Sequence, residues 1–345
     1  MLSQGVCGLK SAFPRPAGFR DNPSSSTLSL LQGVGPVPGW KLVVDYASYV
    51  AVRLAVCVMQ AVSPAACQAA SRQLAWLMWH VLRLRRAVIE ENLAIAFPEA
   101  AADRHAEIAL GMWRHLLLMV SEIAHAPRKL HRTNWRDYSQ IPELEIVSRR
   151  LLDRRPLVIL SGHLGNFEMG GYLLGLHGFP SHSVARRLDN PFLDRWINSF
   201  RGATGQYMLD KAGSGQAIGE LLSAGGTLAL LGDQYAGDGA CWTNFFGKPA
   251  ATHKAVGLFT LGGEAPTAVC ACIRLETPLH FELKLGSLVD PLASDCPVST
   301  IPEVIAWYAR ELERLIRRAP EQYWWVHRRW KGTPPAPRRR KKTAA

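Results

Sequence analysis

The sequence Pro156-Leu-Val-Ile-Leu-Ser-Gly-His-Leu-Gly-Asn-Phe-Glu168 contains a short strand, a loop and the start of a helix. The apolar run at 156–160 is entered at a proline and left at Ser161-Gly162, a pattern typical of a strand buried on both faces. From Phe167 to Leu176 the pattern is that of a helix. A buried strand followed at once by a helix predicts one unit of a parallel α/β sheet.

The later part of the chain repeats this alternation, with strands predicted at 226–232, 265–273 and 281–285 and helices at 191–200 and 304–318. The sequence therefore predicts an α/β fold with a mostly parallel central sheet flanked by helices. In such sheets, functional sites lie beyond the carboxyl ends of the strands.

Residues 40–150 are predicted to form a helical region with a membrane-anchoring helix near 40–62. That segment is mostly apolar and just long enough to span a bilayer, but Asp45 and Arg53 make spanning costly. A second apolar helix at 71–86 contains two tryptophans and ends in arginines, which favours a headgroup boundary. We expect membrane attachment through an interfacial helix or a single-pass anchor, with ordinary core packing as the alternative.

The remaining parts of the chain differ in composition. Residues 1–39 are rich in Pro, Gly and Ser and are predicted to be a disordered extension, without the pattern of a secretory signal peptide. Residues 151–332 form the predicted α/β core. Residues 333–345 are predicted to be a basic disordered tail, and its run Arg338-Arg-Arg-Lys-Lys342 is either solvated or in contact with anionic lipid.

Charge and cysteine content limit the possible partners and cofactors. The chain of 345 residues has 40 Lys and Arg against 28 Asp and Glu, a balance that suits nucleic acid, an anionic membrane or an acidic carrier protein. Its 7 cysteines include no Cys-x-x-Cys pair, and its histidines lack metal-ligand spacing. No nucleotide-binding glycine loop occurs either. The sequence therefore predicts reduced thiols, no metal and no cofactor.

His163 comes three residues after the first predicted strand, and Glu168 follows five residues later. A carboxylate at this spacing is expected to keep one imidazole nitrogen protonated and leave the other as a base. Because the chain has no Gly-x-Ser-x-Gly elbow, His163 is predicted to deprotonate a substrate hydroxyl rather than an enzyme serine. The backbone N–H groups near Gly162 and Gly165 are candidate oxyanion donors. The competing account is a structural histidine beside a carboxylate at a helix N-terminus.

Gly162-His-Leu-Gly-Asn-Phe-Glu168 resembles the His-x-x-x-x-Glu block of the lysophospholipid acyltransferase superfamily, in the form found in bacterial lipid A biosynthesis acyltransferases. Further blocks resemble this family in the same order: 91–98, 185–194, 231–234, 245–252, 264–266 and 320–331. Together they extend the resemblance over residues 40–332.

The resemblance implies transfer of a fatty acyl chain from an acyl carrier protein or CoA thioester to a hydroxyl of a lipid A precursor or related glycolipid. His163 would be the general base and Glu168 its partner, at the inner (cytoplasmic) membrane with the active site facing the cytoplasm. A lysophospholipid or mannosylated lipid acceptor is an alternative within this class. A basic nucleic-acid-binding protein is the alternative from another class, and the intact pair argues against an inactive scaffold. No nucleic acid is expected, because the Trp and Arg residues cluster beside apolar helices.

Polar residues at matching block positions are predicted to bind substrate: Asn166, Arg186, Asn190, Asp233 and Gln234. Arg186 corresponds to the arginine of the family's second block and is the phosphate-binding candidate, since guanidinium binds phosphate through two hydrogen bonds. The neighbouring Arg187 departs from the usual pattern of the family. The structural alternatives are a solvated loop arginine for Arg186 and a helix cap or arginine partner for Asp233.

Overall fold

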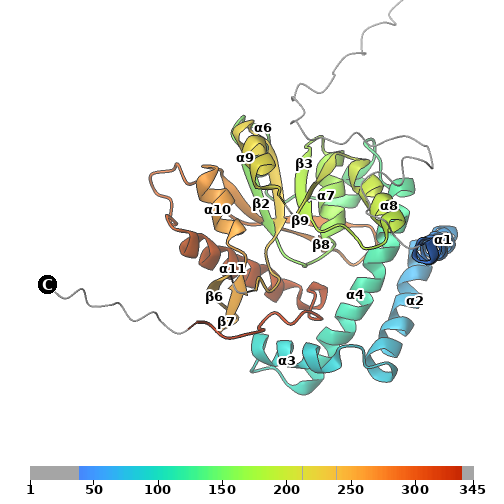
Figure 1. Ribbon diagram of the computed structural model, residues 1–345. Coiled ribbons are helices and arrows are strands. Elements are labelled where there is room, and N and C mark those ends of the chain that lie inside the picture. The colour runs from blue at the N-terminus through green and yellow to red at the C-terminus, as the bar shows by residue number, and fades with distance from the viewer. Residues whose placement is uncertain (1–38, 212, 238, 336–345) are drawn as a thin grey trace, which may run out of the picture.

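The apolar run after Pro156 forms β2 (Leu157–Ser161), which lies in the middle of a seven-stranded sheet of order β1-β9-β8-β2-β5-β3-β4. The computed structural model describes residues 39–211, 213–237 and 239–335 (Figure 1). The predicted extension up to residue 38 and the basic run at 338–342 lie outside the described residues.

The other strands of this sheet are β1 (Ser139–Gln140), β3 (Ser181–Ala185), β4 (Gln206–Asp210), β5 (Thr227–Leu231), β8 (Thr267–Arg274) and β9 (Phe281–Val289). The β8–β9 pair is antiparallel and the remaining pairs are parallel, which confirms the predicted mostly parallel sheet. The sequence analysis missed β3 and β4, because these half-buried strands near the sheet edge lack a continuous apolar run. A separate hairpin consists of β6 (Cys241–Phe245) and β7 (Lys248–Thr252).

Helices cover both faces of the sheet (Figure 1). They are α1 (Gly39–Ala61), α2 (Pro64–Trp76) with a π-helical turn (Leu77–Val81), α3 (Arg86–Ala96), α4 (Ala102–Lys129), α5 (Trp135–Tyr138), α6 (Leu144–Leu152), α7 (Phe167–Leu176), α8 (Pro191–Gly202), α9 (Gly215–Ser223), α10 (Ala255–Gly262), α11 (Ile301–Arg318) and a 3₁₀ turn (Pro320–Gln322). Alternate side chains of β2 pack on opposite faces of the sheet, because successive side chains of a strand point to opposite sides. Val158 and Leu160 join the core with α10 and α11, whereas Leu157 and Ile159 face α6 and α7.

Helix α1 lies on the surface of the protein against α4 and α8. Among the described residues it is the one helix long and apolar enough to cross a membrane, judged by length and composition. Its apolar side chains point outward, as the 71% exposure of Trp40 and 68% exposure of Val43 show. The Asn190 amide donates to the Asp45 carbonyl at 2.7 Å and so ties α1 to the start of α8.

The closing block at 320–331 packs into the core. Tyr323, Trp325 and Trp330 are buried. Arg329 is buried too, and its guanidinium donates to the Ala251 carbonyl at 2.6 Å and to Thr252 Oγ1 at 2.7 Å. The block thus forms a fixed wall beside the carboxyl ends of the strands.

Candidate active site

His163 and Asp233 meet at the carboxyl edge of the sheet. His163 lies in the loop between β2 and α7, and Asp233 follows β5, which pairs with β2 so that Ser161 lies opposite Leu231. Parallel neighbouring strands end at the same edge, so the loops that follow them come together. His163 Nδ1 donates to Asp233 Oδ1 at 2.8 Å, and the His163 backbone N–H donates to Oδ2 at 2.8 Å.

The charges of this pair stabilise each other. Burial by itself raises the pKa of Asp233, but the charge and hydrogen bonds of His163, together with the Arg329 charge, lower that pKa to about 2. Burial lowers the pKa of His163, and Asp233, assisted by the Glu168 charge, reverses this effect and raises it above its usual value. Because the ionised Asp233 only accepts hydrogen bonds, Nδ1 keeps its proton, and Nε2 carries the lone pair of the neutral ring.

Surrounding groups fix the imidazole in place. The Trp324 ring stacks on it at 4.9 Å between centroids and 7° between planes, and Phe167 packs edge-on at 5.0 Å. Gln234 Nε2 lies 3.1 Å from His163 Nε2 and 3.1 Å from His327 Nε2. We refer to His163, Asp233, Gln234 and His327 as the His163 cluster.

Glu168 does not contact the imidazole, which corrects the expectation that it orients His163. Its carboxylate forms a bidentate ion pair with Arg201 of α8, with Arg201 Nε donating at 2.8 Å and Nη2 at 2.5 Å. Glu168 lies in the first turn of α7, which packs against α8, while Asp233 from β5 occupies the position beside Nδ1. Glu168 therefore acts on His163 through its charge and not through a hydrogen bond.

Asn166 is a helix cap and does not line an open site, which corrects the expectation that it binds substrate. Its side chain is 0% exposed. Oδ1 accepts the Met169 N–H at 3.1 Å at the start of α7, and Nδ2 donates to Glu122 Oε2 at 2.9 Å. The Asn166 side chain therefore has no surface left for a ligand.

Behind the loop lies a buried set of side chains that we call the Glu122 cluster: His115, Glu122, Asn166 and Arg274. Arg274 donates to both oxygens of Glu122, from Nε at 2.5 Å and from Nη2 at 2.6 Å. Arg274 Nη1 also donates to His115 Nδ1 at 2.5 Å, so His115 Nε2 donates to the Gly165 carbonyl at 3.1 Å. Burial, and then the Arg274 charge, hold the pKa of His115 well below its usual value.

The loop backbone is tightly enclosed at Gly165. Gly165 has φ +64°, and a Cβ at this position would lie 1.9 Å from the Cys272 carbonyl oxygen. Its N–H donates to the Gln322 carbonyl at 2.9 Å, and the Asn166 N–H donates to the Cys272 carbonyl at 2.8 Å. The Gly165 N–H is therefore engaged, which corrects the expectation that it is available to an oxyanion.

Arg186 and Arg187 follow β3 on the outer rim of the same sheet edge. Arg186 pairs with Asp189 at 2.7 Å and its side chain is 75% exposed. Arg187 forms two hydrogen bonds with Asp210, at 2.8 and 2.6 Å. The structure thus keeps Arg186 accessible to an anion and engages Arg187 in a bidentate pair.

Asn190 caps α8, and its predicted role in substrate binding stays a prediction. Its Oδ1 accepts the N–H groups of Phe192 at 3.0 Å and Leu193 at 3.1 Å. The Asn190 amide nitrogen donates to the Asp45 carbonyl of α1, so both polar ends of the side chain form hydrogen bonds within the protein.

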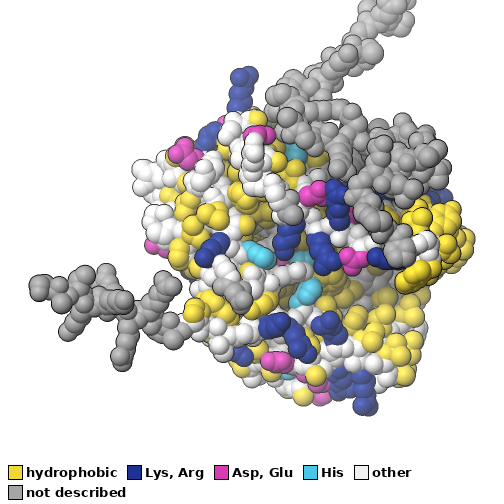
Figure 2. All heavy atoms as spheres, viewed as in Figure 1, with side chains coloured by type: hydrophobic (Ala, Val, Ile, Leu, Met, Phe, Trp, Pro, Cys, Tyr) yellow, Lys and Arg dark blue, Asp and Glu magenta, His cyan; other side chains and the backbone are white. Residues whose placement is uncertain are grey.

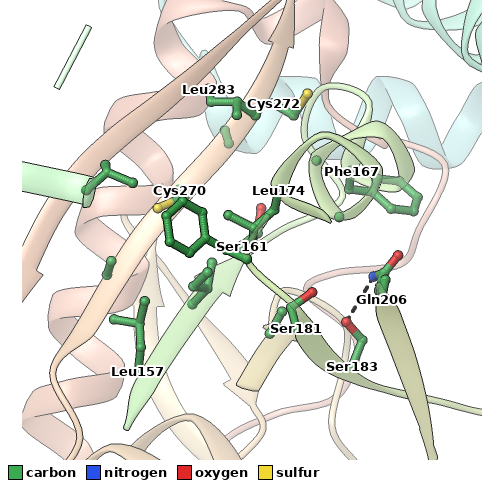
Figure 3. A pocket seen from close by; sticks show the side chains of 18 of the residues that line it. Leu157, Ser161, Phe167, Leu174, Ser181, Ser183, Gln206, Cys270, Cys272 and Leu283 are labelled. Atoms are coloured by element: carbon green, nitrogen blue, oxygen red, sulfur yellow. Dashed lines mark hydrogen bonds between the residues drawn. The ribbon is translucent and has the colours of Figure 1, made fainter. Parts of the chain in front are cut away.

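An apolar cavity of about 220 Å³ extends between the sheet and helices α6 and α7. Phe167 and Leu174 line it from α7, and Leu157 and Cys270 line it from the sheet (Figure 3). Glu168 and Arg201 also line it. Ser161 and Leu231 also line it, and these residues immediately precede the loops that carry His163 and Asp233. The cavity therefore begins beside the His163 cluster.

Comparison with known proteins assigns the chain to a family. The family profile described as bacterial lipid A biosynthesis acyltransferase matches residues 40–332. The chain belongs to this family. It is therefore an acyltransferase, and the predicted family resemblance is confirmed.

Individual lipid A acyltransferases match over most of the chain. The lipid A biosynthesis palmitoleoyltransferase of Escherichia coli (strain K12) is 24% identical over 259 residues, which are 73% of this chain and 81% of the relative. The lipid A biosynthesis lauroyltransferase of the same organism is 23% identical over 263 residues, with the same shares covered. A lipid A biosynthesis acyltransferase of Shigella flexneri is 24% identical over 259 residues, again with 73% of this chain and 81% of the relative covered.

Several residues of this acyltransferase site were not found by sequence reasoning. Arg201 lies 33 residues after its partner Glu168, and Arg274 lies 152 residues after Glu122, so spacing gives no hint of either pair. His327 lies within the closing block at 320–331 that resembles the family, and this position was the one sequence feature that could have marked His327 as a site residue.

Proposed function

We propose that this acyltransferase moves a fatty acyl chain from a thioester to a hydroxyl of a lipid A precursor or related glycolipid, with His163 as general base. One observation carries the proposal: the ionised Asp233 holds Nδ1 of His163 protonated at 2.8 Å and so leaves the lone pair on Nε2. A neutral imidazole held in this way removes a proton from a hydroxyl that comes within hydrogen-bond reach. Family membership supports the acceptor class.

The reaction then proceeds in two steps at the thioester carbon. The acceptor oxygen attacks the carbonyl carbon and forms the new C–O bond, its proton passes to His163 Nε2, and the carbonyl electron pair moves to oxygen. The oxyanion collapses, the C–S bond breaks, and the thiolate leaves with the proton that His163 returns. Asp233 stabilises the imidazolium between the two steps.

The apolar cavity is the proposed site of the acyl chain. It is lined by one face of the sheet from Ser161 at the edge down to Leu157, a distance of about 13 Å for four residues of a strand. Burial of the acyl chain in this cavity favours binding, because apolar surface removed from water contributes roughly 25 cal/mol per Å² to the free energy of binding. A chain inserted from the α7 end places its carbonyl carbon beside His163.

The proposed location is the inner membrane, with the site facing the cytoplasm, where thioester donors are made. Figure 2 shows apolar side chains spread over the region of α1 and α2, and Lys and Arg side chains around histidines on the same face. Apolar helices beside basic groups favour an anionic membrane surface. The same basic groups suit an acidic acyl carrier protein as donor, with CoA as the alternative donor.

The test is an acyl-transfer assay in detergent with acyl carrier protein and CoA thioesters and a panel of acceptors: lipid A precursors, lysophospholipids and mannosylated lipids. His163→Ala is expected to lower kcat by about 10²–10⁴-fold. The exposed His131 provides the matched control His131→Ala, which is expected to retain activity. Full activity of His163→Ala would show that the mechanism is wrong, and transfer only to the other acceptors would exclude the lipid A precursor.

The cavity assignment has its own test. Ala229 lines the cavity opposite Ile159 in the middle of the sheet, so Ala229→Phe is expected to shift the preferred donor to shorter acyl chains. Ala224→Phe, at an exposed position, is the control. An unchanged chain-length profile for Ala229→Phe would exclude the cavity as the acyl site.

A further inference from the structure

The side-chain amide of Gln234 occupies the space in front of the base. Its Nε2 lies 3.1 Å from Nε2 of both His163 and His327. Because His163 Nδ1 donates to the ionised Asp233, the His163 Nε2 carries a lone pair and accepts one amide hydrogen. The second hydrogen of the same NH₂ group goes to His327, which therefore also accepts at Nε2.

An acceptor hydroxyl and this amide compete for the same lone pair. A hydroxyl that donates to His163 Nε2 lies about 2.6–3.2 Å from it, the distance at which the Gln234 nitrogen lies now. Hydroxyl binding thus releases one amide hydrogen of Gln234 from His163. The hydrogen bond to His327 keeps the amide nitrogen beside the attacking oxygen.

Three backbone N–H groups of the loop and the nearby Arg201 guanidinium already have acceptors. The N–H groups of His163, Gly165 and Asn166 donate to Asp233 and to backbone carbonyls. The Arg201 guanidinium is held by Glu168. The indole Nε1 of Trp324 is buried and has no hydrogen-bond partner among the described residues, but it belongs to the ring that stacks on His163 and not to the group that faces its Nε2. The released hydrogen of Gln234 is therefore the polar hydrogen of the His163 cluster that becomes available at the moment of attack.

Building on the proposed acyl transfer, we propose that Gln234 is a catalytic residue that donates this hydrogen to the thioester oxyanion, and that His327 is the residue that positions it. The donor is engaged with His163 in the free enzyme and is released only when the hydroxyl binds. His327 fixes the amide with its nitrogen, and not its oxygen, toward the reacting carbon. Loss of one oxyanion donor typically lowers kcat about 10²–10³-fold.

The first experiment measures kcat and KM of Gln234→Met, which has a similar size and no donor, and of the isosteric Gln234→Glu. Both are expected to lower kcat about 10²–10³-fold at a pH where His163 is neutral, with KM little changed. The exposed Gln216 provides the control Gln216→Met, which is expected to behave as wild type. If Gln234 only steadied the ring, Asp233 and Trp324 would still hold it, and kcat of both variants would remain near wild type. That result would overturn the proposal.

The second experiment tests the positioning role of His327. His327→Gln places an acceptor oxygen near the former Nε2 and is expected to retain most activity, whereas His327→Leu is expected to lower kcat about 2- to 10-fold. Equal kcat values for the two variants would remove His327 from the proposal.

Both experiments include wild type and His163→Ala. Failure of wild type to transfer, or full activity of His163→Ala, rejects the proposed function. Normal transfer that depends on His163 but is insensitive to Gln234 rejects only this inference.

Discussion

The loop at 162–166 has two different polar environments, one on each side. The His163 cluster is partly open, and its hydrogen bonds run from one ionised carboxylate through an imidazole to an amide. The Glu122 cluster behind the loop is closed, and its carboxylate is bound by the Arg274 guanidinium, the Asn166 amide and the Leu279 N–H. Both hold the same five residues of backbone, but only the first presents a lone pair outward.

The two clusters therefore have different roles: the His163 cluster takes part in the proposed reaction, and the Glu122 cluster holds the loop in position. A charge in the Glu122 cluster is fully compensated, so it stabilises the loop and has no capacity left for a substrate. The charge of Asp233 is compensated through His163, the residue that changes protonation in the proposed reaction. Substitutions in the His163 cluster should therefore change rate, and those in the Glu122 cluster should change stability.

The largest effect is expected for Asp233→Asn. An amide that donates toward Nδ1 favours the wrong tautomer and places the proton on Nε2, which removes the base. We expect kcat to fall by about 10²–10⁴-fold in the acyl-transfer assay. Glu168→Gln is the comparison variant, because Glu168 acts on His163 only through its charge. A larger loss for Glu168→Gln than for Asp233→Asn would restore the expectation drawn from the sequence.

The next effect is a loss of stability for Glu122→Gln. The substitution leaves the buried Arg274 without its carboxylate, and breaking a buried pair in this way costs about 3–5 kcal/mol. The free energy of unfolding in urea measures this loss. The exposed pair Arg104–Glu107 provides the control Glu107→Gln, for which at most about 1 kcal/mol is expected. Equal losses for the two variants would contradict the distinction between the clusters.

The smallest effects concern pH. The pKa of His115 is lowered in the folded state, so its contribution to stability is complete above its usual pKa of 6.5 and is lost as the pH falls below that value. The pKa of His163 is raised, so its stabilising pair with Asp233 is complete below 6.5 and is lost as the pH rises through the higher folded value. Activity follows the opposite course, because the base works only when deprotonated.

These directions are measured by urea unfolding and by kcat/KM across pH. His115→Gln is expected to reduce the loss of stability between neutral and mildly acid pH, by up to about 1.4 kcal/mol per pH unit for one proton. The acid limb of kcat/KM is expected to lie above the usual histidine pKa and to remain there in His115→Gln. A shift of that limb in His115→Gln would show that the two clusters are coupled.

The sequence by itself determined the elements that depend on local patterns. Buried runs predicted the strands β2, β5 and β8, alternation of apolar and polar residues predicted β9, and the helical pattern predicted α7, α8 and α11. His163 could be recognised in the same way, because a polar residue directly after a buried strand lies at the sheet edge where sites form. These features depend on residues that are close together in the chain, so the sequence alone is enough to predict them.

Only the tertiary structure decided which carboxylate serves His163. Glu168 is five residues away and Asp233 is 70 residues away, yet the hydrogen bond goes to Asp233. The physical reason is strand order: β5 lies beside β2, so their following loops meet, while the α7–α8 packing brings Glu168 to Arg201. The pairing of β2 with β5 also brings Gln234 in front of the base, and sequence distance carries no information about that neighbour.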